Sequence, residues 1–110
     1  MTRDIAESDW KRFRQLHVVA LERFSEQIMS EIANIQADAT KSYHQRYLET
    51  YKIIQRRDKE MANLFNDPRR STALMQIVAI YRHGLLSDDE LSGFTMELNQ
   101  VVDFLLGHSA

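Results

Sequence analysis

The sequence predicts an all-α fold, an antiparallel helical bundle that forms a single domain over residues 1–110. Two observations carry this prediction. Along two long stretches, apolar side chains recur at steps of three and four residues, which places them on one side of an α-helix. Only three glycines and one proline occur in the 110 residues, so the chain has few positions that would break a helix.

The first long helix is predicted over about residues 9–36. Ser8 and Asp9 precede its apolar stripe, and either side chain could accept from the free N–H groups of the first turn. At ~1.5 Å per residue such a helix spans roughly 40 Å, so other helices must pack along it. The stripe consists of Trp10, Phe13, His17, Leu21, Phe24, Ile28, Ile32 and Ile35.

A second long helix is predicted over about residues 42–66, after a polar turn at 37–41. Asp67 and Pro68 then favour the N-cap and first position of a third helix, which covers about residues 68–83 and ends before Gly84. The inward face of the second helix is predicted to consist of Tyr43, Tyr47, Tyr51, Ile54, Met61 and Phe65, widened by Leu48, Ile53 and Leu64.

The C-terminal region is predicted to form one or two short helices. Ser87 and Glu90 have the spacing of a capping box, in which each side chain binds a free N–H of the first turn. A break near Gly93 separates this helix from a last segment at about 96–106, with Thr95 as its cap. Residues 1–7 and 108–110 are expected to be loosely ordered.

Composition argues against several functional classes. The net charge is −2, whereas dedicated nucleic-acid binders are usually strongly basic. The absence of cysteine excludes disulfides and thiolate chemistry, and it is consistent with a reducing cytoplasm. No apolar run approaches the ~20 residues of a membrane span, and the N-terminus lacks the apolar core of a signal peptide. We therefore expect a cytoplasmic protein without a membrane partner.

The sequence contains no pattern typical of a catalytic, cofactor-binding or metal site. The three glycines are too far apart to form a phosphate-binding loop. None of the four histidines has a glutamate three residues before it, so the Glu-x-x-His pairs of di-iron bundles are missing. We predict no cofactor and no metal. A catalytic site assembled in space stays open, although the sequence favours a protein that is not an enzyme.

One polar pair stands out. His17 lies within the apolar stripe of the first helix, and Asp58 lies on the apolar arc of the second. A hairpin whose turn centres near Ala39 would bring the two within one helical turn of each other, where a carboxylate could pair with the imidazole. The alternative is that Asp58 points to solvent and His17 is an ordinary hydrogen-bonded core histidine.

The middle of the first helix predicts an interface. Residues 15–21 contain no charged side chain, and their apolar side chains point in several directions, which is typical of a helix covered on all sides. Either the later helices of the chain provide that cover, or a second subunit does. The candidate interface residues are Val18, Val19, Leu48 and Ile53, and the leading prediction is a helical protein–protein interaction module that self-associates as a homodimer.

Two alternative functions rest on other side chains. A small-ligand binder or enzyme could use a pocket between helices, lined by Tyr43, His44, Tyr47 and Tyr51, although tyrosines at helical spacing belong more often to cores and interfaces. A nucleic-acid accessory protein could use Arg56, Arg57, Arg69 and Arg70, although the net charge makes nucleic acid an unfavoured partner.

The chain also resembles a family of small bacterial helical proteins to which no biochemistry is assigned. The similar segments are Asp9-Trp10-Lys11-Arg12-Phe13-Arg14 with Ala20-Leu21-Glu22-Arg23-Phe24, then Arg69-Arg70-Ser71-Thr72-Ala73-Leu74, and Gly84-Leu85-Leu86 before a group of acids. The resemblance covers most of the chain. It implies a bacterial cytoplasmic protein and no particular activity or cofactor.

Overall fold

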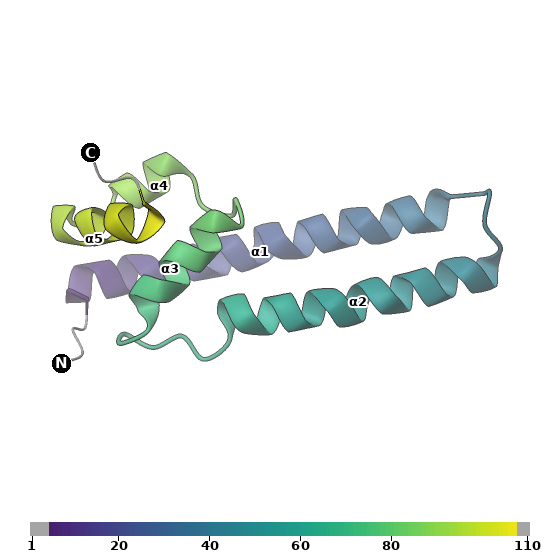
Figure 1. Cartoon of the computed structure of the whole chain (residues 1–110), viewed down its shortest axis with the longest axis horizontal. Coiled ribbons are helices and arrows are strands. Elements are labelled where there is room, and N and C mark those ends of the chain that lie inside the picture. The colour runs from purple at the N-terminus through teal and green to yellow at the C-terminus, as the bar shows by residue number, and fades with distance from the viewer. Residues whose placement is uncertain (1–4, 108–110) are drawn as a thin grey trace.

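Five α-helices make up the regular structure of this protein, in a computed structural model that describes residues 5–107 (Figure 1). The described residues contain no β-strand, which confirms the predicted all-α class. The two long helices are α1 (Glu7–Ala37) and α2 (Tyr43–Phe65), followed by α3 (Ala73–Arg82), α4 (Asp88–Ser92) and α5 (Met96–Leu106). Of the ends expected to be loose, residues 1–4 and 108–110 lie outside the described part. Ile5, by contrast, packs against the core, and Glu7 already begins α1.

The two long helices form an antiparallel hairpin, as the spacing predicted. Asp38 stabilises the turn, because its carboxylate accepts from both the backbone N–H and the hydroxyl of Thr40. Ser42 and Gln45 then form a reciprocal capping box that starts α2. The helices continue well beyond α3, α4 and α5, which gather at the open end of the hairpin, and the molecule measures 53 × 28 × 22 Å (Figure 1).

Two predicted N-caps are wrong. The cap residue of α1 is Ala6, whose side chain makes no cap, and neither Ser8 nor Asp9 takes that position. The third helix begins at Ala73 rather than Pro68; its N-cap is Thr72, and Asp67, the predicted cap, adopts a left-handed conformation with φ of 52°. Residues 66–72 therefore form a connection between α2 and α3.

The C-terminal helices begin and end where the sequence predicted. Ser87 and Glu90 form the capping box of α4, and the Thr95 hydroxyl accepts from the backbone N–H of Leu98 at the start of α5. Gly84 and Gly107 follow α3 and α5 with φ of 73° and 79°, the left-handed region that glycine adopts without a Cβ clash.

The buried core lies at the open end of the hairpin. In α1 the buried apolar residues run from Phe13 to Ile28, and in α2 only Leu64 and Phe65 are buried. From residue 29 to 63 the hairpin contains no buried residue. The remaining core comes from the other helices and the α3–α4 connection: Ala73, Ile77, Val78, Ile80, Leu85, Leu86, Leu91, Phe94, Leu98 and Val102.

Arginines of α1 fasten the short helix α4 to the hairpin. Arg23 makes two hydrogen bonds to the Glu90 carboxylate, Nη1–Oε1 of 2.7 Å and Nη2–Oε2 of 2.9 Å. Arg12 donates from Nη2 and Nε to the Glu90 carbonyl oxygen, at 2.7 and 3.2 Å. The Arg12 guanidinium lies so close to Gly93 that a Cβ at residue 93 would clash with it. Gly93 has an ordinary φ of −77°, so this close approach explains the glycine there.

We expect Gly93→Ala to lower the free energy of unfolding by about 1 kcal/mol, because the added methyl displaces Arg12 from the Glu90 carbonyl. A double-mutant cycle in urea denaturation checks this. In the Arg12→Ala background the same Gly93→Ala change should be nearly silent. An equal loss in both backgrounds would show that the alanine destabilises the α4–α5 connection itself rather than the arginine contact.

Candidate interaction surface

The distal half of the hairpin, the half nearer the α1–α2 turn, has a polar seam between its two helices. Arg57 of α2 donates from Nε to Glu31 of α1 at 2.8 Å, and from Nη1 to Glu60 at 2.8 Å. Towards the turn, Arg46 donates to the carbonyl oxygen of Gln36 at 2.7 Å. Such partly exposed ion pairs contribute little to stability. Because no residue from 29 to 63 is buried, the two helices here also lack the apolar burial that normally stabilises a hairpin.

Most of the large apolar side chains lie on one flank of this seam, and we call this flank the open face. On α1 helical spacing places Val18, Ser25, Met29, Ile32 and Gln36 on this flank. Two shallow hollows join this row to α2. One, of about 250 Å³, is bordered by Met29 and Ile32 with Ile54 and Asp58, and the other by Gln36 with Tyr43 and Tyr47. The row on α2 is Tyr43, Tyr47, Tyr51, Ile54, Asp58 and Met61.

The open face is exposed to an unusual degree for its chemistry. Met29 is 63% exposed, and Tyr43, Tyr47 and Tyr51 are 85, 64 and 54% exposed. α4 contacts a different side of α1, where Arg12 and Arg23 reach Glu90. Large exposed apolar surfaces of this kind typically mark sites of protein association.

The four predicted interface residues do not share one surface. Val18 belongs to the open face and is 67% exposed. Val19, 38% exposed, lies one helical turn from Arg23, on the side of α1 that α4 contacts. Ile53 is half-buried in the seam, one turn from Arg57, and Leu48 points away from the seam on the outer side of α2. The open face therefore includes only one of the four.

His17 and Asp58 are not neighbours. A ring N–H of His17 at Nε2 donates to the carbonyl oxygen of Phe65, 2.9 Å away, which is one of the free carbonyls at the end of α2. Asp58 lies farther along the hairpin, beside Met29 and Ile32. The predicted register differs from the observed one by about one to two turns, and the alternative holds: His17 is a hydrogen-bonded, partly buried histidine packed edge-on against Phe13 and Phe65.

The predicted tyrosine pocket is a surface rather than an enclosed site. Tyr43 and Tyr47 border a hollow of about 430 Å³ together with Arg46, whose guanidinium lies 4.3 Å from the centroid of the Tyr43 ring. His44 stacks on Tyr47 with a centroid distance of 6.1 Å, and Tyr51 does not border this hollow. The tyrosines thus lie along one side of one helix, but they do not enclose a volume in which a ligand would be buried.

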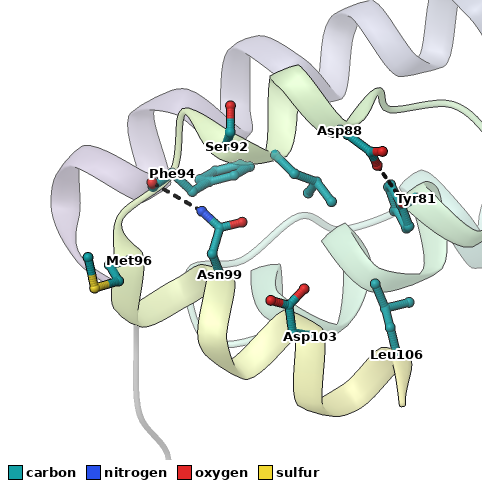
Figure 2. Close-up of a pocket in the computed structure, with 9 residues that line it drawn as sticks. Tyr81, Asp88, Ser92, Phe94, Met96, Asn99, Asp103 and Leu106 are labelled. Atoms are coloured by element: carbon teal, nitrogen blue, oxygen red, sulfur yellow. Dashed lines mark hydrogen bonds between the residues drawn. The ribbon is translucent and has the colours of Figure 1, made fainter. Parts of the chain in front are cut away.

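A hollow of about 570 Å³ between α3, α4 and α5 was not predicted from the sequence (Figure 2). The Tyr81 hydroxyl donates to Asp88 over 2.6 Å, which raises the pKa of Tyr81 because the bond favours the protonated phenol. Asn99 donates to the Phe94 and Thr95 carbonyls, and Asp103 lies nearby on α5. These donors are already used within the chain, so the hollow presents mainly acceptor atoms. Its residues come from three helices, which is why no local pattern revealed it.

The four arginines of the nucleic-acid alternative are engaged within the chain. Arg57 and Arg56 pair with Glu31, and Arg69 pairs with Asp67 at 2.8 Å. Arg70 donates from Nε to the Ile5 carbonyl oxygen at 2.8 Å. These contacts divide the arginines between α2 and the α2–α3 connection, so they do not present one uninterrupted basic surface.

No three potential metal-ligand side chains cluster within residues 5–107. Nor do these residues include a helix long and apolar enough to cross a membrane. Comparison with family models, curated proteins and solved structures gives no match to this chain. The functional interpretation therefore depends on the open face itself.

Proposed function

We propose that this protein is a non-enzymatic helical protein–protein interaction module, and that its open face binds the apolar side of other helices. The observation that carries the proposal is the bare distal hairpin. Between residues 29 and 63 no side chain is fully buried, yet this stretch holds three tyrosines, two methionines and two isoleucines along one flank. A helix pair from a partner would give these side chains the apolar cover that residues 5–107 do not supply.

The proposal accounts for the open face better than the alternatives do. A ligand-binding pocket normally encloses most of its ligand, whereas the tyrosines here are more than half exposed. Tyrosine suits an association surface because its ring buries apolar area while its hydroxyl keeps a hydrogen-bond partner. Such a module takes its biological role from the protein that it binds.

Two adjacent isoleucines give a matched test. Ile54 lies on the open face, and Ile53 lies in the α1–α2 seam. We expect Ile54→Gln to change the free energy of unfolding by at most about 0.5 kcal/mol, as on an ordinary surface, and Ile53→Gln to cost about 1–2 kcal/mol. Urea denaturation at nanomolar concentration, where assemblies dissociate, measures both. If Ile54→Gln costs as much as Ile53→Gln, the open face serves the chain's own fold and the proposal is wrong.

A further inference from the structure

We infer that the partner is a second copy of this chain, which closes the open face as an antiparallel four-helix bundle. In this arrangement α2 lies against α2 of the partner subunit, and the Tyr47 hydroxyl donates to Asp58 of the partner subunit. The inference rests on the proposed function and specifies its partner. It explains why a carboxylate lies within this otherwise apolar and aromatic row.

The row on α2 is nearly symmetric about its centre. Its members follow one another at steps of four, four, three, four and three residues from Tyr43 to Met61. When a second α2 is reversed against it, Tyr43 faces the partner's Met61, Tyr51 faces the partner's Ile54, and Tyr47 faces the partner's Asp58. A two-fold interface requires this reciprocity, since each contact must occur twice.

The polar members of the row have unused bonding capacity. Among the described residues, the Asp58 carboxylate forms no hydrogen bond or ion pair, and the Tyr47 hydroxyl has no acceptor. A phenol is a donor and an ionised carboxylate is an acceptor, so the antiparallel register satisfies both. If the two hairpins instead pointed in the same direction, α2 would lie over α1 of the partner subunit. Asp58 would then face the level of Met29, where the Ser25 hydroxyl already donates to the Leu21 carbonyl and Arg57 donates to Glu31 and Glu60.

The size of the open face fits a dimer of moderate affinity. The α2 row covers 18 steps, or roughly 27 Å at ~1.5 Å per residue, and two helix axes lie ~8–10 Å apart. Two helices at this spacing, together with their side chains, form a face roughly 20 Å wide, so each copy contributes a contact area on the order of 500 Å². Two copies reach the ~1,000 Å² at which specific interfaces begin. We therefore expect the mass in solution to rise from one chain to two with concentration.

The absence of native cysteine makes the register directly testable. Chains carrying Tyr47→Cys, mixed with chains carrying Asp58→Cys, should form a disulfide-linked heterodimer under mild oxidation. Each variant alone should link poorly, because its two cysteines would lie roughly 16 Å apart along the helices, beyond the ~7 Å limit between Cα atoms. Lys52→Cys mixed with Tyr47→Cys is the control, since Lys52 is exposed on the outer side of α2.

The hydrogen bond is tested by light scattering on full-length variants. Tyr47→Phe removes the donor twice per dimer, and we expect the dimer dissociation constant to rise at least tenfold. Tyr51→Phe makes the same change opposite the partner's Ile54 and should leave the constant unchanged. Adding Asp58→Asn to Tyr47→Phe should weaken the dimer less than the two single effects combined, since both remove the same bond. Circular dichroism checks that the variants keep their helices.

The outcomes separate this inference from the function on which it rests. A single-chain mass at all concentrations up to high micromolar overturns the second copy as partner, while the Ile53 and Ile54 comparison still decides whether the chain's own fold uses the open face, which would overturn the proposed function. A two-chain mass without the Tyr47–Asp58 crosslink overturns the antiparallel register alone. Concentration-dependent mass together with that specific crosslink supports both the partner and the register.

Discussion

Replacing Asp9 by alanine should lower the free energy of unfolding by about 3 kcal/mol. Asp9 is the buried charged residue of the core, with 3% of its surface exposed. Its carboxylate accepts from the Thr95 backbone N–H at 2.8 Å and from the Thr95 hydroxyl at 2.6 Å, which ties the start of α5 to the first turn of α1. Alanine would remove two charge-assisted hydrogen bonds and leave a partly buried N–H without an acceptor.

Urea denaturation of three variants separates this contact from ordinary effects at a helix end. Asp9→Asn keeps the shape and one acceptor oxygen, so its loss should be smaller than that of Asp9→Ala. Ser8→Ala, at an exposed residue that makes no cap, should stay within about 0.5 kcal/mol. If Asp9→Ala and Ser8→Ala behaved alike, the Asp9–Thr95 contact would contribute nothing measurable to the fold.

Replacing Glu90 by glutamine should lower the free energy of unfolding by about 1–2 kcal/mol at neutral pH, and this loss should vanish in acid. The two bonds from Arg23 lower the pKa of Glu90 from 4.5 to about 2, against the opposing effect of burial, and the Ser87 backbone N–H adds a further bond. Such a shift corresponds to at most ~3 kcal/mol, which we reduce because Arg23 is 44% exposed and solvent screens the pair.

The direction of the pH dependence follows from linkage. The unfolded chain binds a proton at Glu90 more readily than the folded chain does, so the stabilisation is complete above the unfolded pKa near 4.5. It is lost as the pH falls from there towards 2. Urea denaturation at several pH values should therefore show wild type and Glu90→Gln converging in acid.

Asp89→Asn is the matched control for Glu90→Gln. Asp89 lies in the same first turn of α4 and forms no ion pair with a described residue, so its replacement should cost only the few tenths of a kcal/mol of a helix-dipole interaction. If both variants lost the same stability with the same pH profile, the general charge of the turn rather than the Arg23 pair would stabilise α4.

Sequence patterns predicted the elements well where the relevant contacts are local. The capping box of Ser87 and Glu90, the Thr95 cap and the stop at Gly107 all involve residues within four positions of one another. The exception is Pro68, which suited a helix start by its own preference. In the structure Asp67 adopts a left-handed conformation and α3 begins only at Ala73, so local preference did not decide this start.

The candidate site was only partly predictable, because it depends on which side of each helix is covered. Periodicity grouped Tyr43, Tyr47, Tyr51 and Ile54 correctly on one side of α2, but as an inward face. In the structure a neighbouring row of α2, which includes Ile53 and Arg57, faces α1 in the seam, and the tyrosines remain exposed. A rotation of less than one residue step around the helix axis decides between these outcomes, and spacing alone cannot resolve it.

The sequence by itself determined the helical class, the long hairpin and the local caps, because backbone preference and helical spacing act over a few residues. Tertiary structure alone decided the register of that hairpin. It gave His17 the Phe65 carbonyl and left Asp58 on the open face. It also decided that Asp9, which looked like a helix cap, binds Thr95 across 86 positions of sequence. Such contacts depend on the relative rotation and sliding of whole helices, which the sum of all packing interactions sets.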